Sequence, residues 1–532
     1  MTNTKPNQNQ MKEVQKLFES NDFVALEKKL KELISSYPSI ANLYNILGVV
    51  LQKKNDLNGA ILNFKKAISI QPNFDQAHNN LGNVLQDTGK IEDAIKSFQN
   101  AIKINSKYAG AYSNLGNALS ELQKFDEALK NQKEAVKIEP NNPEFNNNLG
   151  IALKDLGVFE EAIISYKHAI QINPNYAEAY SNLGNALTEL GKIDEALVNY
   201  QKSLKLNPKY KKANLNEGLA RLALGDFENG WKKYEYRLGE GTNIPIRYPT
   251  EKLWRGEYLD GILLVWGEQG IGDHIIFSSM LHDLKRYAKN IILEIDKRLE
   301  DLLKRYFEKI KFSNIKIVDS KDKLTDKYDK HIAIGSLGQY LRKSKESFKT
   351  TPNKWLITSS EKEKKLRNKF FKNNKFKVGI SWGTLNKKQK FRNIDLKEML
   401  PILSNTNCDF IDLQFGKFDE ELNNLKNQHD TNIRSINEID NYNDIDDLAS
   451  LINCLDLVIT IQNSTLHLAG SLGKKTWVML AKNARWHWVK SEKKSLWYQS
   501  VKIFQQEKYG DWKNIIKDVS IELSSLAKLH KN

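Results

Sequence analysis

NNLGNVL at residues 79–85 returns as SNLGNAL at 113–119, as NNLGIAL at 147–153 and as SNLGNAL at 181–187. Each copy stands 34 residues after the one before, and its central glycine belongs to a series of six: Gly48, Gly82, Gly116, Gly150, Gly184 and Gly218. A fixed period of this length is typical of a helical solenoid, in which each unit buries its apolar face only against its neighbours. The period therefore predicts stacked helices over nearly half the chain, with a surface suited to binding.

Other small residues recur at fixed places within each unit. Alanine stands 12 and 19 residues after the glycine in most units, and proline stands 24 residues after it in four of them. Small side chains let two helices approach closely, while proline ends one helix before the next begins. Each unit is therefore predicted to be a helix-turn-helix hairpin. The units run 41–74, 75–108, 109–142, 143–176, 177–210 and 211–244.

The repeats change at both ends of the array. Upstream, Pro38 keeps the phase but Val14 takes the glycine position, so residues 1–40 are expected to hold a degenerate repeat or an N-terminal cap. In the last unit, Gly230 and Arg237 replace the two alanines, as expected where a repeat packs against a different neighbour. The glycine, alanine, alanine and proline pattern resembles the tetratricopeptide repeat. That resemblance implies an α solenoid whose groove holds a protein or peptide partner.

Asparagines follow the same period, two residues before every glycine but the first. At 100° per residue, Asn80 and Asn83 share one side of their helix, with Leu81 and Leu85 on the other, core-facing side. An amide both donates and accepts, which suits it to hold an extended peptide backbone. The alternative is that asparagine is merely tolerated on a solvated face copied by duplication. Stacking would align Asn80, Asn114, Asn148, Asn182 and Asn216 as a ladder along the repeat groove.

The composition fits a soluble protein of two or three domains. The chain has 532 residues, 40% of them hydrophobic and 27% charged, and no apolar run is long enough to cross a bilayer. Its polar start lacks the apolar block of a secretory signal, so a cytoplasmic location is expected. Cys408 and Cys454 stand in apolar stretches and are predicted to be core residues.

Basic residues outnumber acidic ones, 81 against 65, which gives a net charge of +16. Such an excess favours nucleic acid, phosphorylated ligands or an anionic membrane face. The excess is mostly scattered lysine, however, and its one dense cluster at 361–377 is predicted to be a solvated helix and linker. No recognised nucleic-acid motif accompanies the charge, so nucleic acid is not the expected partner.

After residue 244 the period stops, and short apolar runs alternate with helical stretches, which predicts α/β structure. A turn at 268–273 follows the first run and leads into a helix expected from about His274 to Tyr287. Two Rossmann-like halves are expected, at 245–360 and at 378–532 with C-terminal helices. Strands are predicted at 261–267, 290–296, 315–319, 377–383, 409–415, 456–462 and 475–480.

Several segments of this region carry a specific resemblance: LLVWGEQGIGDHIIF (263–277), VGISWG (378–383) with Arg392, DLVITIQNSTLHLAGSLGKKTWVML (456–480), and the closing WHWV, LWYQSVKIFQQ and GDW. They look like the glycosyltransferase domain found behind tetratricopeptide repeats in many bacterial proteins. That domain is similar to the family nine heptosyltransferases and, more distantly, to the O-linked N-acetylglucosamine transferases. The resemblance implies a GT-B fold, with ligands at the C-terminal ends of the strands. It also implies an inverting, metal-independent enzyme that uses a nucleotide sugar and no cofactor.

The segment QNSTLHLAG follows a buried strand and opens a helix, whose free N–H groups and dipole favour phosphate. Transfer from a nucleotide sugar needs such a cradle. Asn463, Ser464, Thr465 and Gly470 are candidates for this donor site, and His467 is a candidate to donate to the departing phosphate. The alternative is that Asn463 and Ser464 only cap the helix and His467 only packs.

One departure from the resembling family leaves the donor and the activity open. The family usually has an Asp-Thr pair where this chain has Gln462-Asn463, which removes a carboxylate able to hold a ribose hydroxyl or a metal. In the loop after VGISWG, the resemblance implies basic residues that contact phosphate. Arg392 is preferred there, because a planar guanidinium grips two phosphate oxygens. Ranked below it are Lys387, Lys388 and Lys390.

On the acceptor side, Asp273 follows the turn Gly270-Ile271-Gly272 and matches the aspartate that heptosyltransferases are thought to use as general base. A carboxylate at a helix start is able to take the acceptor proton, although aspartate there is also a common N-cap. His274 and Glu268 are the substitutes for this role.

Three functions follow from these patterns. The leading hypothesis is a glycosyltransferase whose repeats present a protein or other extended acceptor. The second is a repeat scaffold whose transferase domain has lost activity, and the third is a transferase for envelope saccharide.

Overall fold

The structure is a computed structural model and describes residues 5–384, 392–416, 418–429, 431, 433–483, 486–490, 492 and 494–531. The chain divides into two compact units, Met1–Ala186 and Leu187–Asn532. The division falls within helix α11 (Ala177–Glu189) and not at residue 244, where the 34-residue period ends. The last repeat helices therefore pack with the α/β region.

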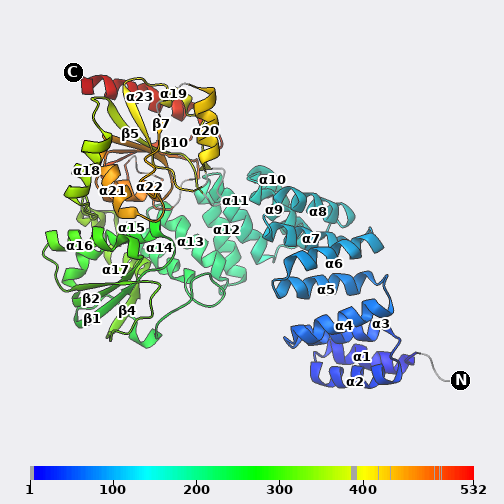
Figure 1. Cartoon of the computed structure of the whole chain (residues 1–532). Helices are drawn as coiled ribbons and strands as arrows, with labels where there is room; N and C mark the ends of the chain where they lie inside the picture. The colour runs from blue at the N-terminus through cyan, green and yellow to red at the C-terminus, as the bar shows by residue number, and fades with distance from the viewer. Residues whose placement is uncertain are drawn as a thin grey trace. The chain divides into compact units, whose positions relative to one another are not determined.

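The first unit is an array of helix hairpins, coloured from blue to cyan in Figure 1. The two helices of each hairpin pack against each other, as the repeat pattern predicts. Helices α1 and α2 form a hairpin in the region expected to hold a degenerate repeat or cap. The helices are α1 (Gln8–Glu19), α2 (Phe23–Ser36), α3 (Ala41–Lys53), α4 (Leu57–Ile70), α5 (Asp75–Asp87), α6 (Ile91–Ile104), α7 (Ala109–Glu121), α8 (Phe125–Ile138), α9 (Pro143–Asp155) and α10 (Phe159–Ile172).

The repeated glycine is needed because a side chain of the second helix lies directly on the first helix at that point. A Cβ on Gly48 would lie 2.5 Å from Cε1 of Phe64, and one on Gly82 would lie 2.4 Å from Cε1 of Phe98. Folded proteins do not tolerate contacts this short without a shift of the neighbouring atoms. The recurring alanines are fully buried in the same packing: Ala60, Ala67, Ala94, Ala101, Ala128, Ala135, Ala162 and Ala169.

The first helices of successive hairpins lie closer together than the second helices do. Contacts join α3 to α5, α5 to α7 and α7 to α9, and they are sparser between the second helices of neighbouring hairpins. A stack curves toward the side on which its members are more closely spaced. The first helices therefore line the inner face of the array.

The second unit combines the last repeat helices with two sheets. Those helices are α12 (Ile193–Leu206), α13 (Lys211–Ala223) and α14 (Phe227–Tyr234). The sheets have the orders β3-β2-β1-β4 and β10-β9-β8-β5-β6-β7, and their strands pair in parallel. Counted from its own first strand, the second sheet runs 6-5-4-1-2-3, which is the doubly wound order of dinucleotide-binding folds. The first sheet has the 3-2-1-4 part of that order.

The sequence located seven of the ten strands that the described residues form, and it missed β4, β7 and β10. β7 has only two residues and β4 has four, too short for a period to show. The strands are β1 (Leu259–Trp266), β2 (Ala288–Ile295), β3 (Ile315–Asp319), β4 (Lys330–Ala333), β5 (Phe376–Ser381), β6 (Cys408–Asp412), β7 (Ile433–Arg434), β8 (Leu457–Ile461), β9 (Thr476–Leu480) and β10 (Val501–Gln505).

One helix prediction needs correction. The helix after β1 begins earlier and ends sooner than expected, because Gly270 takes the N-cap position and a separate 3-10 turn, η3 (Leu281–Arg286), follows. Residues 361–370 of the lysine-rich cluster lie in helix α18, and its last two residues begin β5. The helices are α15 (Ile271–Ser278), α16 (Glu300–Lys309), α17 (Gly338–Leu341), α18 (Ser360–Phe370), α19 (Leu400–Leu403), α20 (Asp419–Gln428), α21 (Ile445–Cys454), α22 (Ser464–Ser471) and α23 (Lys513–Lys531).

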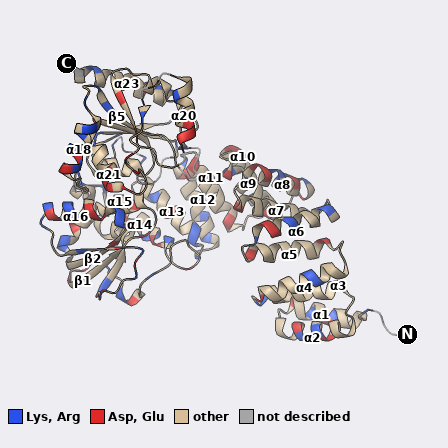
Figure 2. Ribbon diagram, viewed as in Figure 1, with Lys and Arg blue, Asp and Glu red and all other residues tan. Residues whose placement is uncertain are grey.

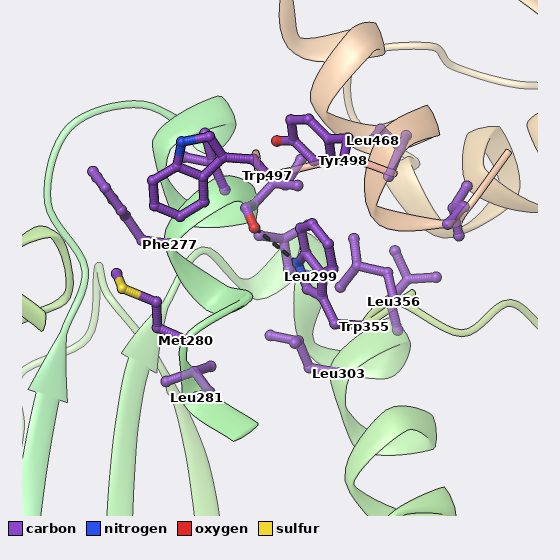
Figure 3. Close-up of a cluster of buried hydrophobic side chains, with 14 of the residues drawn as sticks. Phe277, Met280, Leu281, Leu299, Leu303, Trp355, Leu356, Leu468, Trp497 and Tyr498 are labelled. Atoms are coloured by element: carbon purple, nitrogen blue, oxygen red, sulfur yellow. Dashed lines mark hydrogen bonds between the residues drawn. The ribbon is translucent and has the colours of Figure 1, made fainter. Parts of the chain in front are cut away.

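The two sheet-containing halves of the second unit share one hydrophobic core, shown in Figure 3. Trp355 is fully buried within it, and its Nε1 donates to the backbone oxygen of Ile275 at 2.9 Å. Its ring stacks on Tyr498 with centroids 5.5 Å apart. Tyr498 comes from the second half and Ile275 from α15 of the first. Truncating such a side chain costs about 3–5 kcal/mol, so the shared core fixes one half against the other.

Charge and hydropathy place few further constraints on the fold. Lys and Arg are interspersed with Asp and Glu along both units in Figure 2. Cys408 and Cys454 are buried, as predicted. No helix in the described ranges has the length and apolar character needed to cross a membrane.

Replacing Gly82 by alanine is expected to destabilise the first unit by about 1–3 kcal/mol, because the new Cβ overlaps the ring of Phe98. All ten tryptophans lie at residue 231 or beyond, so tryptophan fluorescence reports the second unit alone. In urea, Gly82→Ala should shift the circular-dichroism transition to lower concentration and leave the fluorescence transition in place. Adding Phe98→Leu should recover part of the loss. Unchanged circular-dichroism unfolding of Gly82→Ala would contradict the close contact.

Candidate functional site

The carboxyl edge of the second sheet holds the segment predicted to bind phosphate. In a sheet of this order, ligands bind where the strand order reverses, which here lies between β5 and β8. β8 ends at Ile461, and α22 begins at Ser464 with Asn463 as its N-cap. Ser464 is half-buried and Thr465 is buried. The first N–H groups of a helix lack partners within the helix, so this edge offers donors to an anion.

Asn463 uses both ends of its amide within the protein. Its Oδ1 accepts from the backbone N–H of Leu466 at 3.3 Å and from Oγ1 of Thr460 at 3.1 Å. Its Nδ2 donates to Oγ of Ser381, at the end of β5, at 2.7 Å. The side chain therefore caps α22, and its bond to Ser381 also ties β8 to β5 at the point where the strand order reverses.

His467 lies in the first turns of α22 and is 7% exposed. Its Nδ1 is 2.7 Å from the hydroxyl oxygen of Tyr498. Burial, reinforced by the charge of Asp273, raises the pKa of Tyr498 well above its usual range, so this hydroxyl keeps its proton. An ideal Cβ on Gly272 would lie 3.2 Å from Cδ2 and 3.9 Å from Nε2 of His467. The Nε2 edge of the imidazole therefore faces the start of α15.

A second histidine, His487, belongs to this site and was not predicted. It is 5% exposed, its ring centroid lies 5.2 Å from that of His467, and its Nε2 lies 3.1 Å from Nε2 of Gln462. The segment WHWV follows β9, the strand next to β8, so its polar residue comes to the same carboxyl edge. That position after a strand was the signal available in the sequence.

The first half contributes the start of α15 to the same place. Gly270 is the N-cap of α15 and makes no side-chain capping bond, and Gly272 lies against His467. Asp273 stands in the first turn and is half-buried. Two helix N-termini, one from each sheet, therefore meet with Asp273 and His467 at their junction.

Two residues predicted as substitute bases are structural, which corrects the prediction. The side chain of Glu268 is fully buried, and its Oε1 accepts from Nε of Arg237 at 3.0 Å. His274 is 4% exposed, and its Nδ1 accepts from the backbone N–H of Asp296 at 3.2 Å. Both were selected by residue type and position, whereas their burial depends on tertiary packing.

Gly470 is also misplaced by the prediction. It lies near the C-terminal end of α22, about 9 Å from Ser464, the first residue of the helix, at 1.5 Å per residue. A Cβ there would lie 2.5 Å from Cδ1 of Tyr498, so the glycine serves packing and does not reach a phosphate at the helix start.

Arg392 lies at the same edge of the second sheet. The backbone N–H of Ile394 donates to the oxygen of Trp382 at 3.0 Å, which returns the loop to the end of β5. Arg392 itself is 7% exposed. The remainder of the predicted basic loop lies outside the described residues, including Lys387, Lys388 and Lys390.

In the first unit, the predicted asparagines form a ladder between successive first helices. They are half-buried and not merely solvated, because each Nδ2 donates to a buried partner in the preceding repeat. Oδ1 of Asn80, Asn114 and Asn148 accepts no hydrogen bond from the described part of the chain. Asn216 is half-buried on α13 of the second unit. The bonds, each 3.0 Å, are Asn80 to Asn45 Oδ1, Asn114 to Asn79 Oδ1, Asn148 to Ser113 Oγ and Asn182 to Asn147 Oδ1.

These features define a helical-repeat array joined to a doubly wound α/β region. Residues 48–89, 82–123, 116–157 and 152–191 match a family model described as TPR repeat, and residues 177–210 match one described as tetratricopeptide repeat. Residues 48–210 are therefore tetratricopeptide repeats, a class of protein-interaction module.

Protein FlbA of Caulobacter vibrioides is 28% identical over 317 residues, which are 56% of this chain and 52% of the relative. The alignment thus spans about half the length of that curated protein. Among solved structures, YrrB, titled a TPR protein with an unusual peptide-binding site, is 22% identical with a TM-score of 0.30 and covers 35% of this chain and 95% of its own. MamA is 28% identical with a TM-score of 0.29, and the match covers 31% of this chain and 97% of MamA. A tetratricopeptide repeat protein from Parabacteroides merdae is 17% identical with a TM-score of 0.38, and the match covers 46% of this chain and 94% of that protein.

The buried His274 is expected to make stability depend on pH. Burial lowers its pKa below the ordinary 6.5, although Asp296 acts in the opposite direction. The folded chain therefore holds a neutral imidazole, whose contribution to the free energy of unfolding is complete above pH 6.5. As the pH falls below 6.5, the unfolded chain binds a proton that the folded chain does not, and this contribution is lost.

His274→Asn keeps an acceptor for the Asp296 N–H but does not titrate. Between pH 7 and pH 5 it should lose less stability than the wild type, by up to about 1.4 kcal/mol per pH unit. Urea unfolding followed by tryptophan fluorescence measures this difference. Parallel pH profiles of the two proteins would contradict it.

Proposed function

We propose that the second unit is a glycosyltransferase, which moves a sugar from a nucleotide-sugar donor to an acceptor hydroxyl. The observation that carries the proposal is the meeting of two helix N-termini, from α15 and α22, at the carboxyl edges of two parallel sheets. Such N-termini favour anions through their free N–H groups and dipoles. The leaving group of this reaction is an anionic nucleotide.

The donor side of the site is the start of α22. The N–H groups of Ser464 and Thr465 would hold the diphosphate, with Arg392 as a cation at the same edge. Because Nδ1 of His467 is engaged by Tyr498, Nε2 is the atom that would donate to the departing phosphate. Asn463 shapes this site by capping and leaves phosphate binding to the backbone.

The acceptor side is the start of α15. Asp273 would take the proton from the acceptor hydroxyl as its oxygen attacks the anomeric carbon. The bond between that carbon and the phosphate oxygen breaks, and the electron pair leaves with the nucleotide. A single displacement of this kind inverts the anomeric centre. The two halves, 245–360 and 378–532, would correspond to the acceptor and donor halves of a GT-B enzyme.

The repeats would hold a protein acceptor in an extended conformation. Each rung of the ladder uses one N–H of an asparagine to join two repeats, and its Oδ1 remains available to a peptide N–H. Contacts to main-chain atoms bind a segment with little regard to its sequence. The inner face would therefore act as a general holder for polypeptide.

Asp273→Asn is expected to lower transfer by about 100-fold or more, because the amide cannot accept the proton. Stability should change little, since the side chains are similar in volume. The measurement incubates purified protein with a panel of nucleotide sugars and follows nucleotide release with and without candidate acceptors. Full activity of Asp273→Asn would remove this residue as base.

The same panel separates the alternatives. If the wild type neither binds nor hydrolyses any donor, the chain is a repeat scaffold with an inactive α/β region. Transfer to a saccharide and not to protein would assign an envelope acceptor.

Replacing Asn114, Asn148 and Asn182 together by alanine should raise KM for a protein acceptor by about 100-fold, through three lost hydrogen bonds of about 1 kcal/mol each. Donor hydrolysis should stay unchanged. Asn63→Ala with Asn131→Ala is the matched control, because these asparagines lie on second helices and donate to their own helix. If both variants shift KM equally, or neither does, the ladder does not hold the acceptor.

A further inference from the structure

The last repeat hairpin reaches into the loop that leads to Asp273. After α14, the 3-10 turn η1 (Glu235–Arg237) ends at Arg237, which is 3% exposed. Its Nη2 and Nε lie 2.5 Å and 3.0 Å from Oε1 of Glu268. Ser336 Oγ accepts from Nη2 at 2.8 Å, and the carboxylate of Glu235 accepts from Nη1 at 2.9 Å. Every nitrogen of the guanidinium therefore has a partner, and the group has a single orientation.

Glu268 is the first anchor of the loop. Besides Arg237, its Oε1 accepts from the backbone N–H of Gly335 at 3.1 Å, and a Cβ on Gly335 would lie 2.5 Å from that oxygen. Its Oε2 is buried and makes no hydrogen bond within the described residues. A buried carboxylate with one unsatisfied oxygen is costly, and hydrophobic replacements of buried ion pairs are often no less stable. The ion pair of Arg237 with Glu268 is therefore explained better by its holding the loop in place than by a gain in the free energy of unfolding.

Gln269 is the second anchor. Its backbone has φ of +66°, which is uncommon for a residue other than glycine. Its Nε2 donates to the hydroxyl oxygen of Tyr234 at 3.0 Å. The ring of Tyr234 lies under the guanidinium of Arg237, 4.2 Å from its central carbon to the ring centroid. Two side chains of the last repeat thus hold two successive residues of the loop.

We infer that Arg237 is a positioning residue for the proposed transfer. By fixing Glu268 and, through Tyr234, Gln269, it sets the start of α15 and with it the place of Asp273 beside His467. The inference rests on the proposed function only for the role of Asp273. On this inference the last repeat hairpin is part of the site, and the repeats do more than bind a partner.

The test compares Arg237→Gln with Arg342→Gln in the full chain. Arg342 makes a similarly buried ion pair with Asp283, at 2.7 Å, but contacts no residue of the loop. Arg237→Gln should speed amide exchange across residues 268–273 at least about tenfold, while exchange in β1 and β2 stays unchanged. Arg342→Gln should leave the loop protected.

Turnover provides the second readout. With a nucleotide sugar that the wild type hydrolyses, Arg237→Gln should lower kcat by about 100-fold and change the donor KM by less than about threefold, because misplacement affects the reacting geometry and not donor binding. Unchanged loop exchange, or equal exchange increases in the loop and the sheet, would overturn the inference.

If Arg237→Gln does not fold, the double variant Arg237→Gln with Glu268→Gln removes both charges and is measured in the same way. A wild type without any donor activity would refute the proposed function. The loop exchange would still decide whether Arg237 fixes the loop.

Discussion

Parallel strands end at a common edge of their sheet. The segments that follow them therefore all begin at that edge. In the second unit this constraint acts twice, because both sheets are parallel and share one core around Trp355. The starts of α15 and α22 are the result, and they meet at Gly272 and His467. The candidate site depends on this arrangement more than on any one side chain, because helix N-termini supply N–H donors whatever their sequence.

Much of the fold was predictable because it repeats. The side chain 16 residues after a repeat glycine occupies the space that a Cβ on that glycine would need. This holds for the glycines at 48, 82, 116 and 150, so the period reflects a physical contact and not only ancestry. The strands that were missed are short, β4 and β7, or lie at the edge of the sheet, β10. The strands with which they pair are distant in sequence, and a local pattern does not contain that information.

Site residues were less predictable for the same reason. Asp273, Ser464 and His467 lie in the first turns of helices that follow strands, and such strand-to-helix transitions are visible in the sequence. Glu268 lies in the turn before α15 and His274 near the start of that helix, yet both side chains are buried. Residue type indicates what a side chain is able to do, whereas only packing decides whether a substrate reaches it. His487, in the segment that follows β9, was not predicted.

The most direct test of the central claim is a crystal structure of the full chain with a nucleoside diphosphate, trying each common nucleotide. The account predicts the diphosphate at the start of α22, within hydrogen-bonding distance of the N–H groups of Ser464 and Thr465 and facing α15. A nucleotide bound elsewhere, or failure of all of them to bind, would contradict it.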